Sequence, residues 1–130
     1  MNVELLCVGL LGLLLFGLGL AVSLERGKAK QLGGVPGDET TRLYRLIRAH
    51  GNASEYVPLI AAFALYFAAT ESSLLVTSLV VWLTAVRFLH ATALITGSDL
   101  KSFNLLRFIG GLGTYLGGLA LSVLAIASAI

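Results

Sequence analysis

Four long runs of residues almost free of charge dominate this sequence. They cover residues 5–24, 56–70, 74–96 and 108–130. A helix that crosses the hydrocarbon core of a bilayer needs about 20 mostly apolar residues, and the runs are apolar on every face, as in the stretch Leu-Leu-Gly-Leu-Leu-Leu-Phe that ends at Phe16. A membrane β-barrel would instead alternate apolar and polar residues. The sequence therefore predicts an all-α membrane protein with four transmembrane helices.

The second run is short, so its helix must begin earlier. We extend it back to the region of Thr40, which makes a helix of about 30 residues, long enough to span a bilayer. Its polar first half must then be shielded from lipid. Residues 71–73, Glu-Ser-Ser, are a very short polar turn, so the second and third helices are predicted to be antiparallel neighbours. With no linker in the chain, residues 1–130 are expected to form a single domain.

Composition excludes several other classes of protein. The mean hydropathy is +0.90 and only 12% of the residues are charged, which is too apolar for a soluble domain of this length. Residues 1–4 include Glu4 and no basic residue, which disfavours a cleaved signal peptide. Cys7 is the sole cysteine, so neither an intrachain disulfide nor a thiolate metal cluster is expected, and no other metal site is predicted.

The basic residues gather at two of the predicted loops. Loops rich in Lys and Arg face the cytoplasm, so both termini are expected on the opposite side of the membrane. Such residues also contact lipid headgroups, which makes membrane lipids, and not nucleic acid, the expected partners. Arg87 lies within the third helix, Lys101 and Arg107 flank the third loop, and the first loop is surrounded by Arg26, Lys28, Lys30, Arg42, Arg45 and Arg48.

A polar stripe on the second helix carries most of the functional signal. Its members are spaced 3, 4 and 3 residues apart, which places them within an arc of about 80° on one helix face. They are Arg45, Arg48, Asn52 and Glu55. An unpaired charge inside a bilayer costs about 3 kcal/mol and is normally paired or turned toward a water-filled site.

The third helix has a matching polar face, formed by Arg87 and His90. Counted from the turn at residues 71–73, Glu55 and Arg87 lie about 21 to 24 Å away along their helices, and so at nearly the same depth. We therefore predict an ion pair between them, with Asn52 and His90 one turn nearer the cytoplasm. The pair can simply lock the two helices together. A surplus of cations, namely Arg45, Arg48, Arg87 and Arg107, favours instead a bound anionic ligand.

Other residues lie near this constellation. Arg26 ends the first helix and is expected to reach a site in the cytoplasmic half. His50 lies off the stripe, and we favour a place in the polar interface over a contact with a second subunit. Tyr115 follows Arg107 by two turns and is either a hydrogen-bonding wall residue or a packing aromatic.

In the fourth helix, two rows of small residues predict close packing within or between subunits. The rows are Gly113 with Gly117, and Gly110 with Thr114 and Gly118.

The pattern Arg-Ala-His-x-Asn-x-x-Glu, which runs from Arg48 to Glu55, resembles the signature of the MAPEG family, the membrane-associated proteins in eicosanoid and glutathione metabolism. The resemblance extends to Arg87, His90 and Arg107 and covers essentially the whole chain. It implies a left-handed four-helix bundle that assembles as a homotrimer with glutathione between subunits. Arg48, Asn52 and Glu55 would then contact the tripeptide, with further charge from Arg45, Arg87 and Arg107. An arginine near the sulfur lowers the thiol pKa, and Arg107 is assigned to stabilising the thiolate.

The chain departs from the prostaglandin E synthase type of that family at four positions. That type has a second arginine where Gly51 stands, a serine at Phe108, and tyrosines at Leu94 and Gly111. These changes remove the hydroxyls most often proposed to act on the thiol. The chain is more similar to the small bacterial members, which implies a bacterial inner membrane and leaves the substrate open.

Two functions of different class follow from these residues. The first is a glutathione-dependent transferase or peroxidase, of the microsomal glutathione transferase type, that attacks a hydrophobic electrophile entering from the bilayer. The second is a non-catalytic scaffold of the same fold that binds a lipid or fatty acid. A small transporter is disfavoured because the chain has no inverted repeat. Whether the protein is an enzyme stays open at this point.

Overall fold

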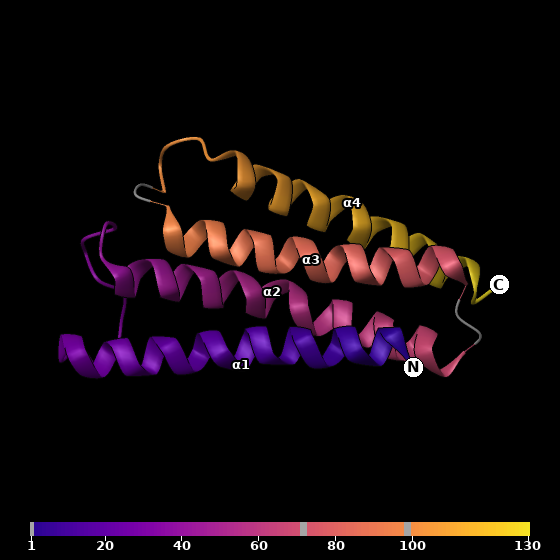
Figure 1. Ribbon diagram of the computed structural model, residues 1–130, viewed down its shortest axis with the longest axis horizontal. Helices are drawn as coiled ribbons and strands as arrows, with labels where there is room; N and C mark the ends of the chain where they lie inside the picture. The colour runs from indigo at the N-terminus through magenta and orange to yellow at the C-terminus, as the bar shows by residue number, and fades with distance from the viewer. Residues whose placement is uncertain (1, 71–72, 98–99) are drawn as a thin grey trace.

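The structure, a computed structural model, describes residues 2–70, 73–97 and 100–130. These residues form four helices: α1 (Val3–Ala29), α2 (Arg42–Ala69), α3 (Leu74–Thr96) and α4 (Leu105–Ala127). Figure 1 shows the helices side by side in chain order, with α1 and α4 at opposite edges and both termini at the same end. Of the predicted turn, Glu71 and Ser72 lie outside the described residues.

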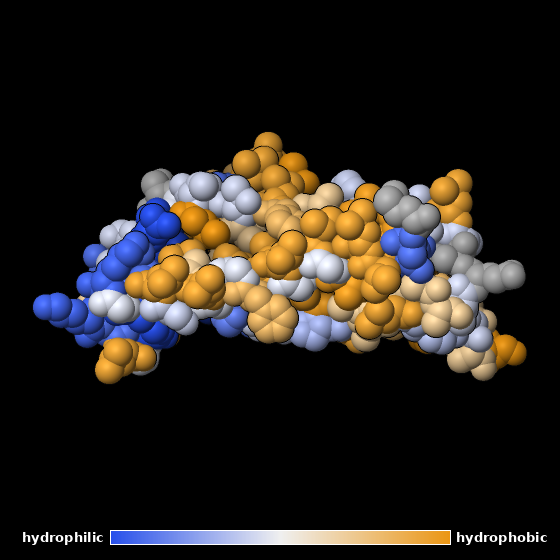
Figure 2. All heavy atoms as spheres, turned by 60° about the horizontal axis from the view of Figure 1, so that its bottom comes forward, coloured by the Kyte–Doolittle hydropathy of each residue, from blue (hydrophilic) through white to orange (hydrophobic). Residues whose placement is uncertain are grey.

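Three of the helices, α1, α3 and α4, are long and apolar enough to cross a membrane. α2 is as long as they are, but its polar first half lowers its hydropathy. Large apolar side chains, among them Leu13, Phe16 and Leu119, face outward from the bundle. Figure 2 shows this apolar surface along the molecule, with most of the strongly hydrophilic residues at one end and a smaller hydrophilic patch toward the other. The predicted all-α, four-helix membrane fold is confirmed.

Each helix begins at a residue whose side chain accepts a hydrogen bond from a backbone amide of the first turn. Such caps satisfy one of the amide groups that a helix start leaves without a partner. The acceptor is Asn2 in α1, Thr41 in α2, Ser73 in α3 and Asn104 in α4. The start of α2 at Arg42, directly after Thr41, agrees with the predicted start near Thr40.

The bundle core lies along α2 and α3, which pack against each other and against the outer helices. Leu11 from α1, Ala53 from α2 and Val80 from α3 are fully buried there. By contrast, α2 and α4 make few contacts with each other. The sparse contact between α2 and α4 leaves space between them that forms part of the candidate site.

Glycines bring α4 close to α3, as the small-residue rows predicted. A Cβ atom added at Gly110 would lie 2.9 Å from the Cα atom of His90, and one added at Gly117 would lie 2.8 Å from a methyl carbon of Leu83. Both distances are shorter than van der Waals contact. A Cβ atom at Gly118, in contrast, would meet nothing within 4 Å. The close packing predicted for this helix therefore occurs within the chain, and Gly118 takes no part in it.

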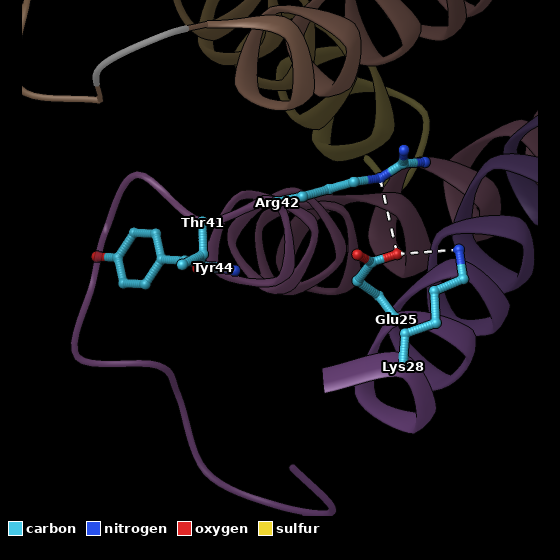
Figure 3. Close-up of polar contacts among 5 residues, drawn as sticks. All are labelled: Glu25, Lys28, Thr41, Arg42 and Tyr44. Atoms are coloured by element: carbon cyan, nitrogen blue, oxygen red, sulfur yellow. Dashed lines mark hydrogen bonds and ion pairs between the residues drawn. The ribbon is translucent and has the colours of Figure 1, made fainter. Parts of the chain in front are cut away.

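Polar contacts join the end of α1 to the start of α2 and order the loop between them. The Glu25 carboxylate lies between two cations, 3.4 Å from Lys28 and 3.8 Å from Arg42 (Figure 3). Further along the loop, hydrogen bonds from the Thr40 hydroxyl and amide hold the pKa of the Asp38 carboxyl below its usual range. Lys101, in the loop before α4, lies 3.3 Å from Glu39. The two loops at this end of the bundle are thereby joined.

Candidate functional site

The polar stripe on α2 divides into two rows that face different surroundings. Arg45 and Asn52 are partly buried and face α3, whereas Arg48 and Glu55 are exposed. The members of each row are seven residues apart, a turn of about 20° around the helix axis, while the two rows are separated by about 60°. Among the described residues, the hydrogen bonds from this stripe to α3 and its cap come from the inner row alone.

Arg87 is the most deeply buried charge of the site, with 1% of its surface exposed. Its Nη2 atom donates a hydrogen bond to Oδ1 of Asn52 at 2.6 Å, and its Nη1 atom donates to Oγ1 of Thr114 at 3.3 Å. The guanidinium also lies over the ring of Tyr56, 5.3 Å from its centroid. Its Nε atom is buried without a hydrogen-bond partner among the residues that the structure describes. Within that part of the chain, the guanidinium connects α2, α3 and α4 through neutral groups.

The predicted ion pair between Glu55 and Arg87 is wrong. Glu55 belongs to the outer row of α2, and no ion pair joins it to Arg87 in the part of the chain that the structure describes. Helix spacing predicted similar depths for Glu55 and Arg87, but it did not predict that Arg87 bonds to Asn52 while Glu55 is exposed. Asn52, one turn closer to the predicted cytoplasmic end and about 60° around the helix, is the partner of Arg87.

Arg45, the other member of the inner row, lies at the end of α3. Its Nη1 atom donates to the carbonyl oxygen of Gly97, the residue that caps α3, at 2.6 Å. A cation there interacts favourably with the negative end of the helix dipole. Its Nε atom is buried without a hydrogen-bond partner in the described structure. Arg45 therefore has a structural contact of its own, and its role toward a ligand stays a prediction.

His90 lies on α3, where α3 packs against the start of α4. Its Nδ1 atom is 3.0 Å from the carbonyl oxygen of Arg107, and the absence of a side chain at Gly110 lets the helices approach at this point. Beside it lies a cavity of about 10 Å³ that is also bordered by Asn52, Arg87 and Thr114. A polar cavity of that size has room for about one water molecule. His50, by contrast, packs against Gly19 of α1, and its predicted place in the polar interface stays a prediction.

Tyr115 lies where three hollows meet, bordering the small cavity and two larger grooves. Its hydroxyl is 3.5 Å from that of Tyr56, and the two rings contact edge to face with centroids 5.9 Å apart. Tyr115 is therefore placed to donate or accept a hydrogen bond at the mouth of the site. Tyr56 and Thr114 were not assigned to the site from the sequence, although Tyr56 follows Asn52 by four residues and so shares its helix face.

The larger groove runs between α2 and α4 and has a volume of about 320 Å³. Glu55, Tyr56 and Tyr115 border one part of it, and the rest is mainly apolar, with Leu59, Ile60, Phe63, Gly118, Leu119 and Ser122 among its walls. This groove can accept an apolar group beside a carboxylate and two hydroxyls.

A second groove, of about 280 Å³, follows the outer side of α4. Arg107 borders it together with Phe108, Gly111 and Tyr115. Phe108 stands in its wall, where it adds an apolar ring and no hydroxyl. The Nη2 atom of Arg107 donates to the carbonyl oxygen of Ser102 at 2.7 Å, so this guanidinium is held at the groove by its own loop.

Arg26 is not brought to the other site residues in this chain. Its Nη2 atom donates to the carbonyl oxygen of Gly34 at 2.8 Å, and its Nη1 atom contacts that of Gln31 at 3.5 Å. Its assigned role toward a ligand stays a prediction. Among the described residues, no group of three or more His, Cys, Asp or Glu side chains is arranged to hold a metal ion.

The model of one protein family matches nearly the whole chain. This model is described as "MAPEG family" and matches residues 5–127. The matched residues include every member of the site described above. No curated protein and no solved structure matches the chain.

Proposed function

This chain belongs to the MAPEG family, and we propose that it is a glutathione-dependent transferase or peroxidase of the membrane. In this proposal, glutathione binds along the polar face of α2 and its thiolate attacks a hydrophobic electrophile that enters from the bilayer. The family is one of membrane proteins of eicosanoid and glutathione metabolism, which supports the co-substrate. The rest of the proposal depends on the arrangement of charges around α2.

The observation that carries the proposal is the exposure of Arg48 and Glu55 on a helix packed within a membrane bundle. Each would cost about 3 kcal/mol if it faced hydrocarbon, so both need a covering with charge and hydrogen-bonding groups. Glutathione has these groups: its two carboxylates suit Arg48 and the other cations, and its ammonium suits Glu55. A row with both signs of charge fits a ligand with both signs.

The same exposure supports an assembly of several copies. A ligand as small as glutathione, bound to one protomer, leaves part of the outer row of α2 against lipid, whereas a neighbouring protomer can cover the remainder. We propose a homotrimer with glutathione between protomers, in the half of the membrane that contains the polar part of α2. We also propose that this half faces the cytoplasm of a bacterial inner membrane, with both termini on the other side.

For the chemical step, we assign stabilisation of the thiolate to Arg107, with help from Tyr115. The thiol of glutathione gives its proton to water, its sulfur forms a bond to an electrophilic carbon of the substrate, and the bond from that carbon to the leaving group breaks. A nearby guanidinium favours the thiolate by its charge. The paired hydroxyls of Tyr56 and Tyr115 border the groove. They offer a hydrogen bond in a chain that has Phe108 and Leu94 where the prostaglandin E synthase type carries hydroxyl groups.

The apolar groove between α2 and α4 supports a lipophilic second substrate. Its volume of about 320 Å³ lies within the range of small-molecule pockets, and its walls are mainly hydrocarbon. The same groove favours the alternative that the protein holds a fatty acid or lipid without turning it over. In that case Arg48 or Arg107 would bind the carboxylate and the acyl chain would lie in the groove.

A conjugation assay separates the two functions. Purified protein in mild detergent is incubated with glutathione and 1-chloro-2,4-dinitrobenzene, and the thioether is measured against an Arg48→Ala variant. The proposal expects turnover that depends on Arg48. Native mass spectrometry of the same preparation tests the alternative. If fatty acid or lipid co-purifies, with no glutathione adduct and no turnover with this or other electrophiles, the protein is a lipid-binding protein and not an enzyme.

A further inference from the structure

The loop after α1 exposes apolar side chains at the charged end of the bundle. Leu32 has 92% of its surface exposed and Val35 has 55%. Burying a leucine side chain is favourable relative to leaving it in water. Such exposure in a well-formed loop is therefore unfavourable unless another apolar phase covers these side chains.

Hydrogen bonds hold the loop in this shape. Lys30 ends α1 in the left-handed backbone conformation, with φ 51° and ψ 33°, and the amide of Gln31 donates back to the carbonyl oxygen of Arg26 at 3.1 Å. This is the reversal typical of helix ends. The Arg26 guanidinium then contacts the carbonyl oxygens of Gln31 and Gly34. Leu32 lies between these two contact points, so the loop presents it outward as a fixed feature.

The loop lies at the depth of the lipid headgroups. The uncharged part of α1 covers residues 5–24, which at about 1.5 Å per residue spans about 30 Å, the thickness of the hydrocarbon core. Glu25 and the residues after it therefore fall in the interfacial layer. Because the chain reverses at Lys30 and is bound back to Arg26, residues 31–34 stay close to that layer instead of extending into water.

Basic residues precede the exposed leucine in the chain. The Lys30 ammonium has no ion-pair partner among the described residues, and Lys28 shares the single carboxylate of Glu25 with Arg42 (Figure 3). Two cations on one carboxylate leave a net positive charge at the end of α1, from which the loop begins. A second copy of the same loop would be repelled by this charge, whereas anionic headgroups would be attracted.

We propose that this loop is a membrane-interface anchor specific for anionic phospholipids. Leu32 and Val35 enter the upper acyl-chain region, and Lys28 and Lys30 bind the phosphate-bearing headgroups. Arg26 is the positioning residue, since its contacts with the loop carbonyls present Leu32 to the membrane. The anchor does not depend on glutathione, and it gives Arg26 a role apart from the candidate site.

Tryptophan placed at residue 32 tests the insertion. Trp82 is the sole tryptophan, so Leu32→Trp in a Trp82→Phe background gives one emitting side chain in bilayer nanodiscs of phosphatidylcholine and phosphatidylglycerol. The proposal expects blue-shifted emission that is quenched by lipids brominated in the upper acyl chain. Gly37→Trp is the matched control, because it lies in the same loop with open space around it and beside acidic residues; its emission should resist the brominated lipids.

Two results would overturn the anchor. Emission at the wavelength of water-exposed tryptophan, quenched by acrylamide and not by brominated lipid, would place Leu32 in water. Blue-shifted emission without quenching by brominated lipid would mean that protein covers it, as in an interface between copies. Either outcome can be read whether or not the protein binds glutathione.

The preference for anionic lipid has its own test. Native mass spectrometry after release from the mixed nanodiscs measures the ratio of retained phosphatidylglycerol to phosphatidylcholine. Lys30→Gln should lower that ratio by up to about fivefold, the effect of one cation near an anionic surface. Lys101→Gln removes the same charge from a residue that is paired with Glu39 and should change the ratio less. Equal ratios in the wild type and in Lys30→Gln would refute the proposed specificity.

Discussion

Arg87 on α3 donates a hydrogen bond to Asn52 on α2 across 2.6 Å, in a place where the guanidinium is almost completely buried. The described structure gives this cation no carboxylate partner, and Thr114 and the ring of Tyr56 complete its surroundings. A buried charge held by neutral groups alone fixes three helices relative to one another, and it keeps Asn52 facing inward beneath the outer row of α2.

The coupling between Arg87 and Asn52 can be measured by a double-mutant cycle. We expect Arg87→Met and Asn52→Leu each to alter the free energy of unfolding in detergent, and the double variant to differ from their sum by about 2 kcal/mol, as expected for a hydrogen bond to a charged group. Simple additivity of the two changes would show that the contact contributes nothing to stability. Arg87→Met should lose less stability than Arg87→Ala, because methionine fills the volume of the guanidinium stem.

A pair of glycine substitutions tests the close approach of α3 and α4. Gly110→Ala would place a methyl group 2.7 Å from the Cβ atom of His90, so we expect it to lower stability by about 2 kcal/mol. Gly118→Ala adds the same group to the same helix where nothing lies within 4 Å, and it should be neutral or stabilising, since alanine favours helix. Thermal unfolding of both variants measures the difference, and equal melting temperatures would contradict this packing.

The hydroxyl of Tyr115 is expected to matter for rate and little for folding. Tyr115→Phe removes a group 3.5 Å from the Tyr56 hydroxyl and keeps the ring contact, so conjugation should slow by about tenfold, the effect of one hydrogen bond to a charged atom. The KM for glutathione should change little. Tyr66→Phe is the matched control, because its hydroxyl contacts Ser128 near the C-terminus. A rate unaffected by Tyr115→Phe would assign that side chain to packing.

The membrane fold followed from the sequence because hydrophobicity alone determines which segments leave water. The same reasoning placed Glu55 and Arg87 at a common depth, which depends only on helix rise. It failed on direction: a stripe of about 80° has two edges, and which edge meets α3 depends on how the helices pack. Arg87 therefore bonds to Asn52 on the inner edge, while Glu55 on the outer edge is exposed and borders the groove between α2 and α4.

Residue spacing also does not predict which neighbouring helix a small residue contacts. Gly110 and Gly117 face α3 within the chain, whereas Gly118, in one of the same predicted rows, borders the groove between α2 and α4. Arg26 illustrates a further limit. Its position at the end of α1 was read correctly, but its contacts with Gln31 and Gly34 arise from a reversal of the loop that no spacing pattern encodes.

Titration calorimetry of glutathione into the purified protein tests the central claim most directly. The account predicts binding at millimolar glutathione or below, weakened at least tenfold by Arg48→Ala or Glu55→Ala through loss of a charge-assisted hydrogen bond of about 1.5 kcal/mol or more. Arg42→Ala, which removes another exposed arginine from α2 but one that contacts Glu25, should bind as the wild type does. No detectable binding at millimolar glutathione, or binding that neither Arg48→Ala nor Glu55→Ala weakens, would contradict a glutathione site on this face of α2.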